Sequence, residues 1–218
     1  MPLMMNALAK LPVSTLCDVD KSLPVADPAI RPITASARLC GPAYTAVATD
    51  EFLSTLWAIN DAAPGDVLVV QTGGSRLAAL GELLAAEAYR RRLGGILVDG
   101  YVRDRGGLPP QLPLWARGSV PNAGRSDAVP NVGGQIAFGG LPVTPGDIVV
   151  ADDDGIVIAP RARLEACLVQ AAQIEQTEAA ILAGIQGGTS LIEMTNLADH
   201  VAALRSGNQS KLSITPPS

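Results

Sequence analysis

The chain has 218 residues, of which 48% are hydrophobic and 17% are charged, and its formal net charge is -5. This length can bury the core of one large domain or of two small ones. Because no block of like charge accompanies the acidic excess, a nucleic-acid-binding surface is disfavoured. No apolar run approaches the ~18 residues of a membrane span, and the start lacks a signal-peptide pattern. We therefore expect a soluble, cytoplasmic protein that binds neither nucleic acid nor membrane.

Cysteine and histidine chemistry is disfavoured as well. Cys17, Cys40 and Cys167 are odd in number and far apart, and the single histidine is His200. Because the sequence has no CxxC pair and no Cys/His zinc spacing, we expect neither a disulfide scaffold nor a structural zinc site. We expect the cysteines to be buried small side chains and His200 to be a surface residue of the last helix.

Up to residue 61 the pattern predicts two helices with a strand between them. Ser14 and Thr15 precede an apolar position and are suited to cap a short helix. Tyr44, Thr45 and Val47 favour a strand. The expected elements are a helix within 12–20, a loop over 24–32, a strand within 35–48 and a helix over 51–61.

A Pro-Gly-Asp turn occurs twice, at 64–66 and at 145–147, and each time a fully apolar run of strand length follows. The turn starts a strand in both places. The two occurrences are either a faint internal repeat or one strand-starting turn used twice, and we favour the second interpretation.

The segment between these turns predicts a helix and a buried strand. Leu83, Leu84, Ala88 and Leu93 share a helical spacing, and Gly94-Gly95 ends the helix. Residues 96–98 form an apolar strand that is expected to end at Asp99-Gly100. Strand, helix and strand in this order predict a parallel βαβ unit.

The second half predicts further strands and two helices. A turn at 152–155 joins the run at 148 to a second apolar run at 156–159, as in a hairpin. No linker divides the chain, so we expect one α/β domain over residues 1–218. The remaining expected elements are a strand at 112–116, a strand near 135–138, a helix from 160, a helix near 191–204 and a polar tail that is frayed or contacts another subunit.

Several catalytic classes lack their residues. GxxxxGK[ST] and GxSxG motifs are absent, and Lys10, Lys21 and Lys211 all lie near the termini. An imine-forming aldolase needs a lysine held in a core site, so that mechanism is disfavoured.

Arg103 and Asp104 directly follow the predicted buried strand, where ligand sites of parallel sheets collect. Asp104 is suited to hold a hard cation, and Arg103 to bind a carboxylate with two hydrogen bonds. An ion pair that caps a surface turn is the alternative.

Gly81 weakens any helix that continues from upstream, so a helix is expected to begin at Glu82. The free N–H groups near Leu83 and Leu84 would then form an anion site, and Glu82 would add a second carboxylate. The alternative is a solvent-facing Glu82 stabilised by the helix dipole.

Together these pieces resemble one family. Glu82, twenty residues and then Arg103-Asp104 match the acidic-X20-Arg-Asp signature of the class II 4-hydroxy-4-methyl-2-oxoglutarate / 4-carboxy-4-hydroxy-2-oxoadipate aldolases, which share a fold with the regulator of ribonuclease activity A (RraA). The similarity extends over about residues 35–185 and includes PGDVLVV and FGGLPVTPGDIVVADDDGIVIAP. The resemblance implies a layered α/β fold of the swivelling, phosphohistidine-domain type, with the C-terminal helices and tail at 160–218.

The resemblance also implies a site and an activity. Mg²⁺ or Mn²⁺ is held by Asp104, largely through waters, with help from Glu82. Arg103 and the backbone N–H groups of the turn at 81–84 bind pyruvate. A glutamate of a neighbouring subunit, with Glu175 and Glu178 as candidates, completes the site in a homotrimer or dimer of trimers. The expected function is a metal-dependent carbon–carbon lyase that cleaves a pyruvate-type 2-oxo acid and also decarboxylates oxaloacetate.

Two other functions remain open. A non-catalytic, protein-binding regulator resembling RraA is the main alternative, and the presence of Glu82 argues against it. A methyltransferase is less favoured, because no glycine-rich SAM loop followed by an acidic residue occurs. The N-terminal third and the loop at 121–134 depart from the family, so the natural substrate is not implied.

Overall fold

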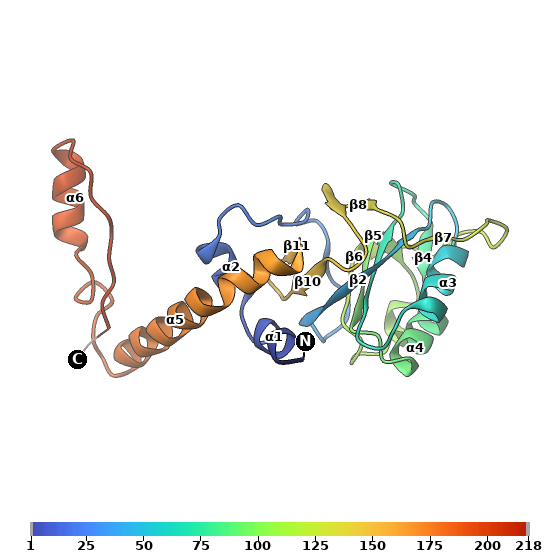
Figure 1. Cartoon of the computed structure of the whole chain (residues 1–218), viewed down its shortest axis with the longest axis horizontal. Coiled ribbons are helices and arrows are strands. Elements are labelled where there is room, and N and C mark those ends of the chain that lie inside the picture. The colour runs from blue at the N-terminus through green and yellow to red at the C-terminus, as the bar shows by residue number, and fades with distance from the viewer. Residues whose placement is uncertain (1, 217–218) are drawn as a thin grey trace. The chain divides into compact units, whose positions relative to one another are not determined.

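The computed structural model describes residues 2–216 (Figure 1). Its contacts divide the chain into two units, with the boundary between Leu168 and Val169. The first unit contains the α/β fold, and the second contains the C-terminal half of a long helix and all that follows. The expectation that residues 1–218 form one domain stays a prediction.

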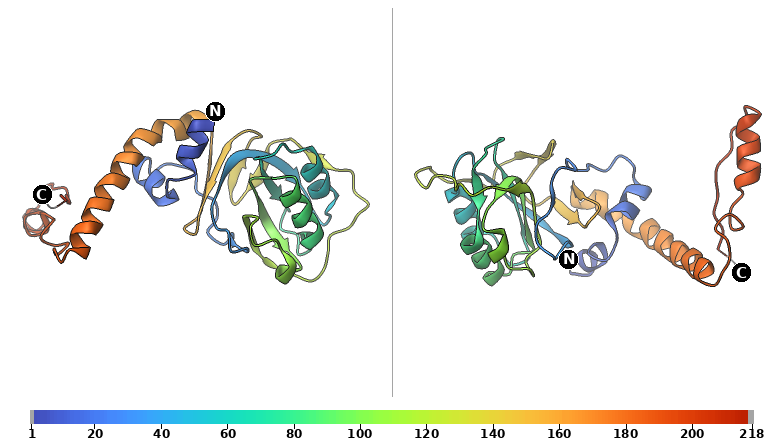
Figure 2. Two further views of the ribbon diagram at one scale, coloured as in Figure 1. Left: turned by 90° about the horizontal axis from the view of Figure 1, so that it is seen from below. Right: turned by 180° about the vertical axis from the view of Figure 1, so that it is seen from behind.

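The first unit is built on a mixed sheet, and the helices at residues 53–61 and 82–90 cover one of its faces (Figure 2). The strand order is β1-β6-β5-β3-β2-β10-β11, with β4 paired to β5 and β7 paired to β2. The elements of this unit are α1 (Pro2–Leu8), α2 (Val13–Val19), β1 (Arg31–Pro32), β2 (Leu39–Val47), α3 (Leu53–Asp61), β3 (Val67–Gln71), β4 (Ala78–Leu80), α4 (Glu82–Arg90), β5 (Gly95–Val102), the 3-10 helix η1 (Arg105–Gly107), β6 (Leu114–Ser119), β7 (Asn131–Val132), β8 (Ile136–Phe138), β9 (Leu141–Val143), β10 (Ile148–Ala151), β11 (Ile156–Ala159) and the start of α5 (Arg161–Gln186).

The central strands are apolar on both sides because both faces of the sheet are covered. In β3, Leu68 and Val70 pack into a core with helices α3 and α4, where Ala58, Ile59, Ala85 and Ala88 are buried. The alternate residues Val67 and Val69 pack on the other face, in a core with the β8–β9 hairpin and the β10–β11 hairpin. The period-2 alternation of a strand thus supplies two cores from one apolar run.

The predicted βαβ unit is confirmed. Strands β3 and β5 are parallel and paired from Val67↔Gly95 to Gln71↔Asp99, and α4 lies between them in the sequence. The predicted end of the second strand at Asp99-Gly100 is wrong, because β5 continues to Val102. Asp99 remains in the strand since its carboxylate is paired with Arg117, and Gly100 lies so close to Thr72 that only glycine fits there.

The helix predicted within residues 12–20 forms, but its predicted cap is wrong. Helix α2 begins at Val13, and neither Ser14 nor Thr15 caps it. The Val13 N–H instead donates to the Asp152 carboxylate, 2.8 Å away and 139 residues along the chain. The free N–H at the start of this helix is therefore bound by a carboxylate that is distant in the sequence, and not by the hydroxyl of Ser14 or Thr15 as predicted.

The two Pro-Gly-Asp turns have the same local structure. Gly65 and Gly146 both have positive φ, and Asp66 and Asp147 each accept a hydrogen bond from the backbone N–H three residues earlier. The strands that follow are not equivalent, because β3 runs parallel to β2 whereas β10 runs antiparallel to it. This favours one strand-starting turn used twice over an internal repeat.

The second unit consists of residues 169–216 of the described chain. It contains the rest of α5, a turn region and α6 (Leu197–Arg205), which is shorter than the helix predicted near 191–204. The tail is not simply frayed, because Ile214 pairs with Thr195 in an antiparallel bridge and Thr215 N–H donates to Met194 O. No helix in the described part of the chain is both long and apolar enough to cross a bilayer.

Candidate functional site

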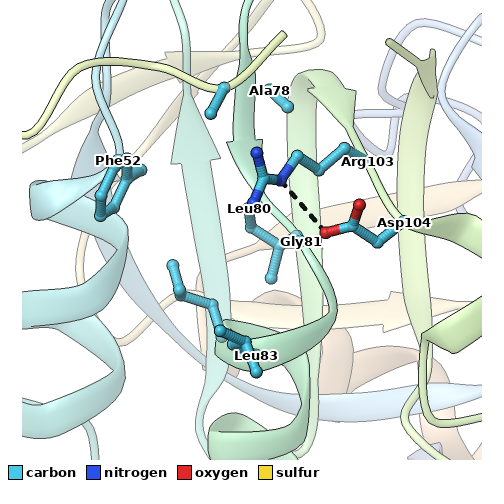
Figure 3. A pocket seen from close by; sticks show the side chains of 9 residues that line it. Phe52, Ala78, Leu80, Gly81, Leu83, Arg103 and Asp104 are labelled. Atoms are coloured by element: carbon cyan, nitrogen blue, oxygen red, sulfur yellow. Dashed lines mark ion pairs between the residues drawn. The ribbon is translucent and has the colours of Figure 1, made fainter. Parts of the chain in front are cut away.

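Two neighbouring strand ends bring the predicted residues together. Strands β4 and β5 are parallel, with Leu80 opposite Val102, and the Arg103 N–H donates to Leu80 O at 3.0 Å. The chain leaves β4 into Gly81 and α4, and leaves β5 into Arg103 and Asp104. Glu82 and Asp104, which are 22 positions apart in the sequence, therefore follow neighbouring strands, and the start of α4 lies beside Asp104 (Figure 3).

Asp104 has a left-handed backbone, with φ 55° and ψ 41°. For a residue other than glycine this conformation costs roughly 1–2 kcal/mol. It turns the carboxylate back toward the start of α4, where Oδ2 lies 3.1 Å from Arg103 Nε and 3.4 Å from the Glu82 backbone nitrogen. Backbone strain at such a position is typical of functional sites, where surrounding contacts hold it.

Gly81 leaves the room that this arrangement needs. A Cβ at this position would lie 2.5 Å from Asp104 Oδ2 and 2.9 Å from Arg103 Cγ. Gly81 is the N-cap of α4, and its carbonyl accepts the hydrogen bond from the Ala85 N–H at 3.0 Å. The helix thus begins at Glu82, as the sequence predicts, and the N–H groups of Leu83 and Leu84 precede its first intrahelical bond.

The Glu82 carboxylate points toward the turn after Asp104 rather than into the cavity. Its oxygens lie against Gly107, where an added Cβ would collide with them. The side chain is exposed, and its carboxylate makes no hydrogen bond or ion pair within the described residues that would hold it away from Asp104. Glu82 is therefore beside the predicted site but not part of its wall.

A cavity of about 180 Å³ opens at this point (Figure 3). Its polar side is formed by Arg103 and Asp104, whose side chains are 40% and 43% exposed. The residues that line it are Phe52, Ala78, Leu80, Gly81, Leu83, Leu84, Arg103, Asp104 and Ala123. Gly81, Leu83, Leu84, Arg103 and Asp104 were predicted from the sequence.

The sequence did not reveal the remaining wall. Phe52 precedes α3, Ala78 and Leu80 belong to the short strand β4, and Ala123 belongs to the loop at 121–134. These residues carry no chemical motif, and they meet only through contacts between distant segments. The only available signal was that the 121–134 loop is unusual, which pointed to a role in substrate choice without identifying a residue.

The donors fit a hard divalent cation held mostly by water. Asp104 Oδ1 has no protein partner in the described chain, and the carboxylate is half exposed. No group of three or more His, Cys, Asp or Glu side chains among the described residues is arranged so that it could hold a metal ion. One or two carboxylates with several waters is how Mg²⁺ commonly binds, whereas zinc and calcium sites need more protein ligands.

The other predicted residues lie elsewhere. Glu175 and Glu178 are on α5 in the second unit, so their role at the site of a neighbouring copy stays a prediction. His200 is half-buried on α6. Burial raises the pKa of the Cys40 thiol to about 11 and also raises the pKa of Cys17 and Cys167, so these thiols stay protonated and unreactive near neutral pH.

Comparison with known proteins decides the family. The model of the RraA-like family, described as Aldolase/RraA, matches residues 13–158. The chain belongs to the RraA-like family. The layered α/β fold expected from the resemblance is thereby confirmed, and the match contains all of Gly81, Glu82, Arg103 and Asp104.

Relatives of the RraA-like chain carry several names. A protein of Halalkalibacterium halodurans, provisionally named 4-hydroxy-4-methyl-2-oxoglutarate aldolase, is 31% identical over 74% of this chain and 78% of its own length. A Bacillus cereus protein with the same provisional name is 32% identical over 67% of this chain and 94% of its own. The shorter relatives thus match almost completely while leaving about a third of this chain uncovered.

Solved structures show the same fold under other descriptions. RraAS2 of Streptomyces coelicolor, described as an unusual member of a ribonuclease-inhibitor family, has a TM-score of 0.71 at 28% identity, covering 82% of this chain and 94% of its own. A Geobacillus kaustophilus protein described as a 2-dimethylmenaquinone methyltransferase has a TM-score of 0.64 at 30% identity, covering 69% and 95%. These descriptions differ, so the activity must be argued from the site.

Proposed function

We propose that this protein is a divalent-metal-dependent carbon–carbon lyase that cleaves a pyruvate-type 2-oxo acid, in the manner of a 4-hydroxy-4-methyl-2-oxoglutarate aldolase. One observation supports this above the others. Arg103, the Asp104 carboxylate and the start of α4 converge on a single cavity. A cation-binding acid and two anion-binding groups side by side are what a 2-oxo acid requires.

Arg103 and α4 bind the carboxylate of the substrate. The guanidinium donates to one or both carboxylate oxygens, and its exposed tip faces the cavity (Figure 3). The N–H groups of Leu83 and Leu84, at the positive end of the helix dipole, donate to the same anion. This fixes the 2-oxo group near Asp104.

Asp104 would hold Mg²⁺ or Mn²⁺, with Glu82 as the second carboxylate. When bound, the cation supplies Lewis-acid stabilisation of negative charge on the 2-oxo oxygen. Arg103 already pairs with Asp104 Oδ2, which leaves Oδ1 as the oxygen without a protein partner among the described residues. The Arg103 charge also lies where the enolate charge develops, so it stabilises that charge without reorganising.

The C4 hydroxyl proton would pass through a water to Glu82, once the exposed side chain of Glu82 turns from Gly107 toward Asp104. As that proton leaves, the C4 oxygen becomes a carbonyl, the C3–C4 bond breaks and its electron pair forms the pyruvate enolate. Protonation of the enolate at C3 gives pyruvate. With oxaloacetate, loss of carbon dioxide leaves the same enolate, so Arg103 stabilises both reactions equally.

An assay of pyruvate formation from oxaloacetate and from a 4-hydroxy-2-oxo acid, with and without Mg²⁺, tests the proposal. Arg103→Ala should lower kcat/KM about 10²–10³-fold, as loss of a charge-stabilising donor does in other enzymes. Arg105→Ala is the matched control, because Arg105 is exposed two residues away and does not line the cavity. Full activity of Arg103→Ala would remove Arg103 from the site, and no turnover by the wild type would favour the protein-binding regulator.

We also propose that the protein is a homo-oligomer, a trimer or dimer of trimers. Large apolar side chains of the second unit are exposed, and the described part of that unit buries only Ala171 and Met194 among its hydrophobic residues. Such a segment cannot supply its own core. Association with other copies gives these side chains a permanent cover.

A further inference from the structure

We propose that the fragment released from the substrate carries an uncharged alkyl group, and that Phe52 determines this preference. The inference rests on the proposed lyase function and extends it to the half of the substrate that does not become pyruvate. It concerns the apolar wall, defined as Phe52, Ala78, Leu83 and Ala123.

The cavity has two chemically different sides. Arg103 and Asp104 form one side, and Phe52 and Leu83 lie across the cavity from them (Figure 3). If the carboxylate and 2-oxo group of the substrate occupy the side of Arg103 and Asp104, C4 and its substituent must extend toward Phe52. The substituent therefore meets the apolar wall.

The apolar wall is held in place by backbone hydrogen bonds. The Ala78 N–H donates to Asn122 O at 2.8 Å, and the Gly124 N–H donates to Ala78 O at 3.0 Å, so both sides of Ala123 are fixed to β4. These bonds join the unusual loop at 121–134 directly to the strand that leads into Gly81. The backbone of the wall at Ala78 and Ala123 is therefore preorganised.

Phe52 is fixed just as firmly. Its N–H donates to Arg125 O at 3.1 Å. The preceding residue, Glu51, is 4% exposed, and its Oε2 accepts the Ser54 N–H at 3.0 Å at the start of α3. The Glu51 carboxylate is thus used to cap the helix, and it leaves Phe52 as the side chain that this corner presents to the cavity.

The charges of the lining decide which substituent fits. Among the described residues that line the cavity, Arg103 is the one cation, and the pyruvate carboxylate uses it. A second carboxylate at C4 would lose water against Phe52 and Leu83 without gaining a partner, which is unfavourable. An alkyl group would gain from the same burial, and Leu83 is 79% exposed and available to cover it.

This preference differs from the substrate in the provisional name of the Halalkalibacterium halodurans relative, because 4-hydroxy-4-methyl-2-oxoglutarate has a carboxylate at each end. The pyruvate half of the site agrees with that name. The apolar wall accounts for the 4-methyl group but offers no cation to the second carboxylate.

Two substrates that share the pyruvate half and differ in the group attached to C4 test the inference. In 4-hydroxy-2-oxohexanoate, the hydroxyl proton passes to the base, the C3–C4 bond breaks, C4 becomes the carbonyl of propanal, and C3 of the enolate takes a proton to give pyruvate. In 4-hydroxy-2-oxoglutarate the same step gives pyruvate and glyoxylate. The measured quantity is the ratio of kcat/KM for the first substrate to that for the second, with Mg²⁺.

The wild type should favour the hexanoate at least tenfold, the scale on which hydrophobic pockets distinguish one methylene. Phe52→Arg should shift the ratio at least tenfold toward the glutarate, and Phe52→Leu should leave it on the alkyl side. Trp57→Arg makes the same aromatic-to-cation change on an exposed residue of α3 that does not line the cavity, so it should leave the ratio unchanged. Comparing variants cancels the intrinsic reactivity of the two substrates.

The outcomes separate this inference from the proposed function. The inference would be overturned if both substrates are cleaved and Phe52→Arg does not change the ratio of their kcat/KM values. It would also be overturned if the wild type favours 4-hydroxy-2-oxoglutarate. Either result would leave the proposed lyase function standing. Absence of pyruvate from both substrates and from oxaloacetate would overturn the proposed function itself. If Phe52→Arg fails to fold, a series of substrates tested with the wild type decides. The wild-type kcat/KM should rise from 4-hydroxy-2-oxobutanoate to 4-hydroxy-2-oxopentanoate and again to 4-hydroxy-2-oxohexanoate. A kcat/KM that stays constant or falls along this series contradicts the inference.

Discussion

At the scale of single residues, the site depends on how closely glycine lets the chain approach itself. Gly81 and Gly107 flank the two carboxylates, and a Cβ on either would meet one of them. Gly81 faces Asp104 and Arg103, which also contact each other and form the polar side of the cavity. Gly107 faces only the free end of the exposed Glu82 side chain, which can move away.

Alanine at these glycines should therefore separate the contributions of the two carboxylates. Gly81→Ala should lower pyruvate formation at least tenfold, because Asp104 and Arg103 must both shift. Gly107→Ala should cause a smaller loss, because Glu82 alone is displaced. Gly106→Ala is the control, since nothing lies within 4 Å of the added Cβ. The check is kcat/KM with oxaloacetate, alongside thermal unfolding; equal activity of the Gly81 and Gly106 variants would show that the close contact is not needed.

The left-handed backbone of Asp104 gives a second prediction at this scale. Asp104→Asn keeps a residue that tolerates φ near 55° and removes the charge. It should fold with unchanged stability and lose Mg²⁺-dependent turnover. Asp104→Gly should raise the free energy of unfolding by about 0.5–1 kcal/mol through relief of strain and should also be inactive. Urea unfolding and the coupled assay measure the two effects, and Mg²⁺-dependent activity in the Asn variant would contradict the role of the carboxylate.

At the scale of elements, β5 is held at its end by ion pairs on the face opposite the site. Arg117 of β6 lies 2.5 Å from Asp99 Oδ1 and 2.8 Å from Asp27 Oδ2, and the Gly139 N–H donates to the other oxygen of Asp99 at 2.8 Å. These contacts join β5 and β6 to two loops. They also let the strand continue past Asp99 to Val102, which places Arg103 and Asp104 at the cavity.

Arg117→Gln should lower the free energy of unfolding by about 1–3 kcal/mol, because Asp99 would keep a partly buried charge without its partner. Arg125→Gln is the control, since its 3.8 Å pair with Asp127 is largely exposed and should contribute close to zero. Urea unfolding at neutral pH checks both variants. Equal stability of the two would show that the Arg117 contacts do not hold the strand end.

The same ion pairs predict an acid response with a definite sign. The Ala29 N–H and the Arg117 guanidinium hold the pKa of Asp27 below its ordinary value of 3.8. A carboxyl group whose pKa is lower in the folded than in the unfolded state stabilises the fold at pH values above its unfolded-state pKa. This stabilisation is lost as the pH falls through its folded-state pKa. Wild-type stability should thus decline below about pH 4, and Arg117→Gln should show a shallower decline, as measured by urea unfolding from pH 6 to pH 2.5.

Local sequence patterns predicted the central elements because these elements depend on local properties. The apolar run at 67–70 is a strand because both of its faces are buried. Helix α4 begins at Glu82 because the glycine before it, Gly81, is the N-cap and has an extended backbone. The cap of α2 and the apolar wall were not predictable in this way. Asp152 reaches Val13 from 139 residues away, and Phe52, Ala78 and Ala123 meet through long-range pairing alone. Three apolar residues at 78–80 are also too short a run to identify β4.

At the scale of the whole molecule, the family match ends at residue 158 and the second unit begins at Val169. The Bacillus cereus relative is matched over 94% of its own length but over only 67% of this chain, so about a third of this chain has no counterpart in it. Within α6, Leu197, Val201 and Leu204 share one face of the helix at i, i+4 and i+7, and Leu197 and Leu204 are exposed. An apolar seam of this spacing is suited to pack against another helix.

The double variant Leu197→Glu/Leu204→Glu should therefore lower the mass of the particle in solution, because it places two charges on the seam that other copies are expected to cover. Ala202→Glu is the matched control, since Ala202 is exposed on the far side of α6 and the same charge there leaves the seam intact. Light scattering across a range of concentrations should give the wild type and Ala202→Glu three or six times the chain mass, and the double variant less. A wild type at the mass of one chain, or a double variant of unchanged mass, would show that α6 does not hold copies together. The α/β unit keeps its own two cores in either case, so oxaloacetate turnover of the double variant then tells whether the neighbouring copy contributes a residue, such as Glu175 or Glu178, to the site.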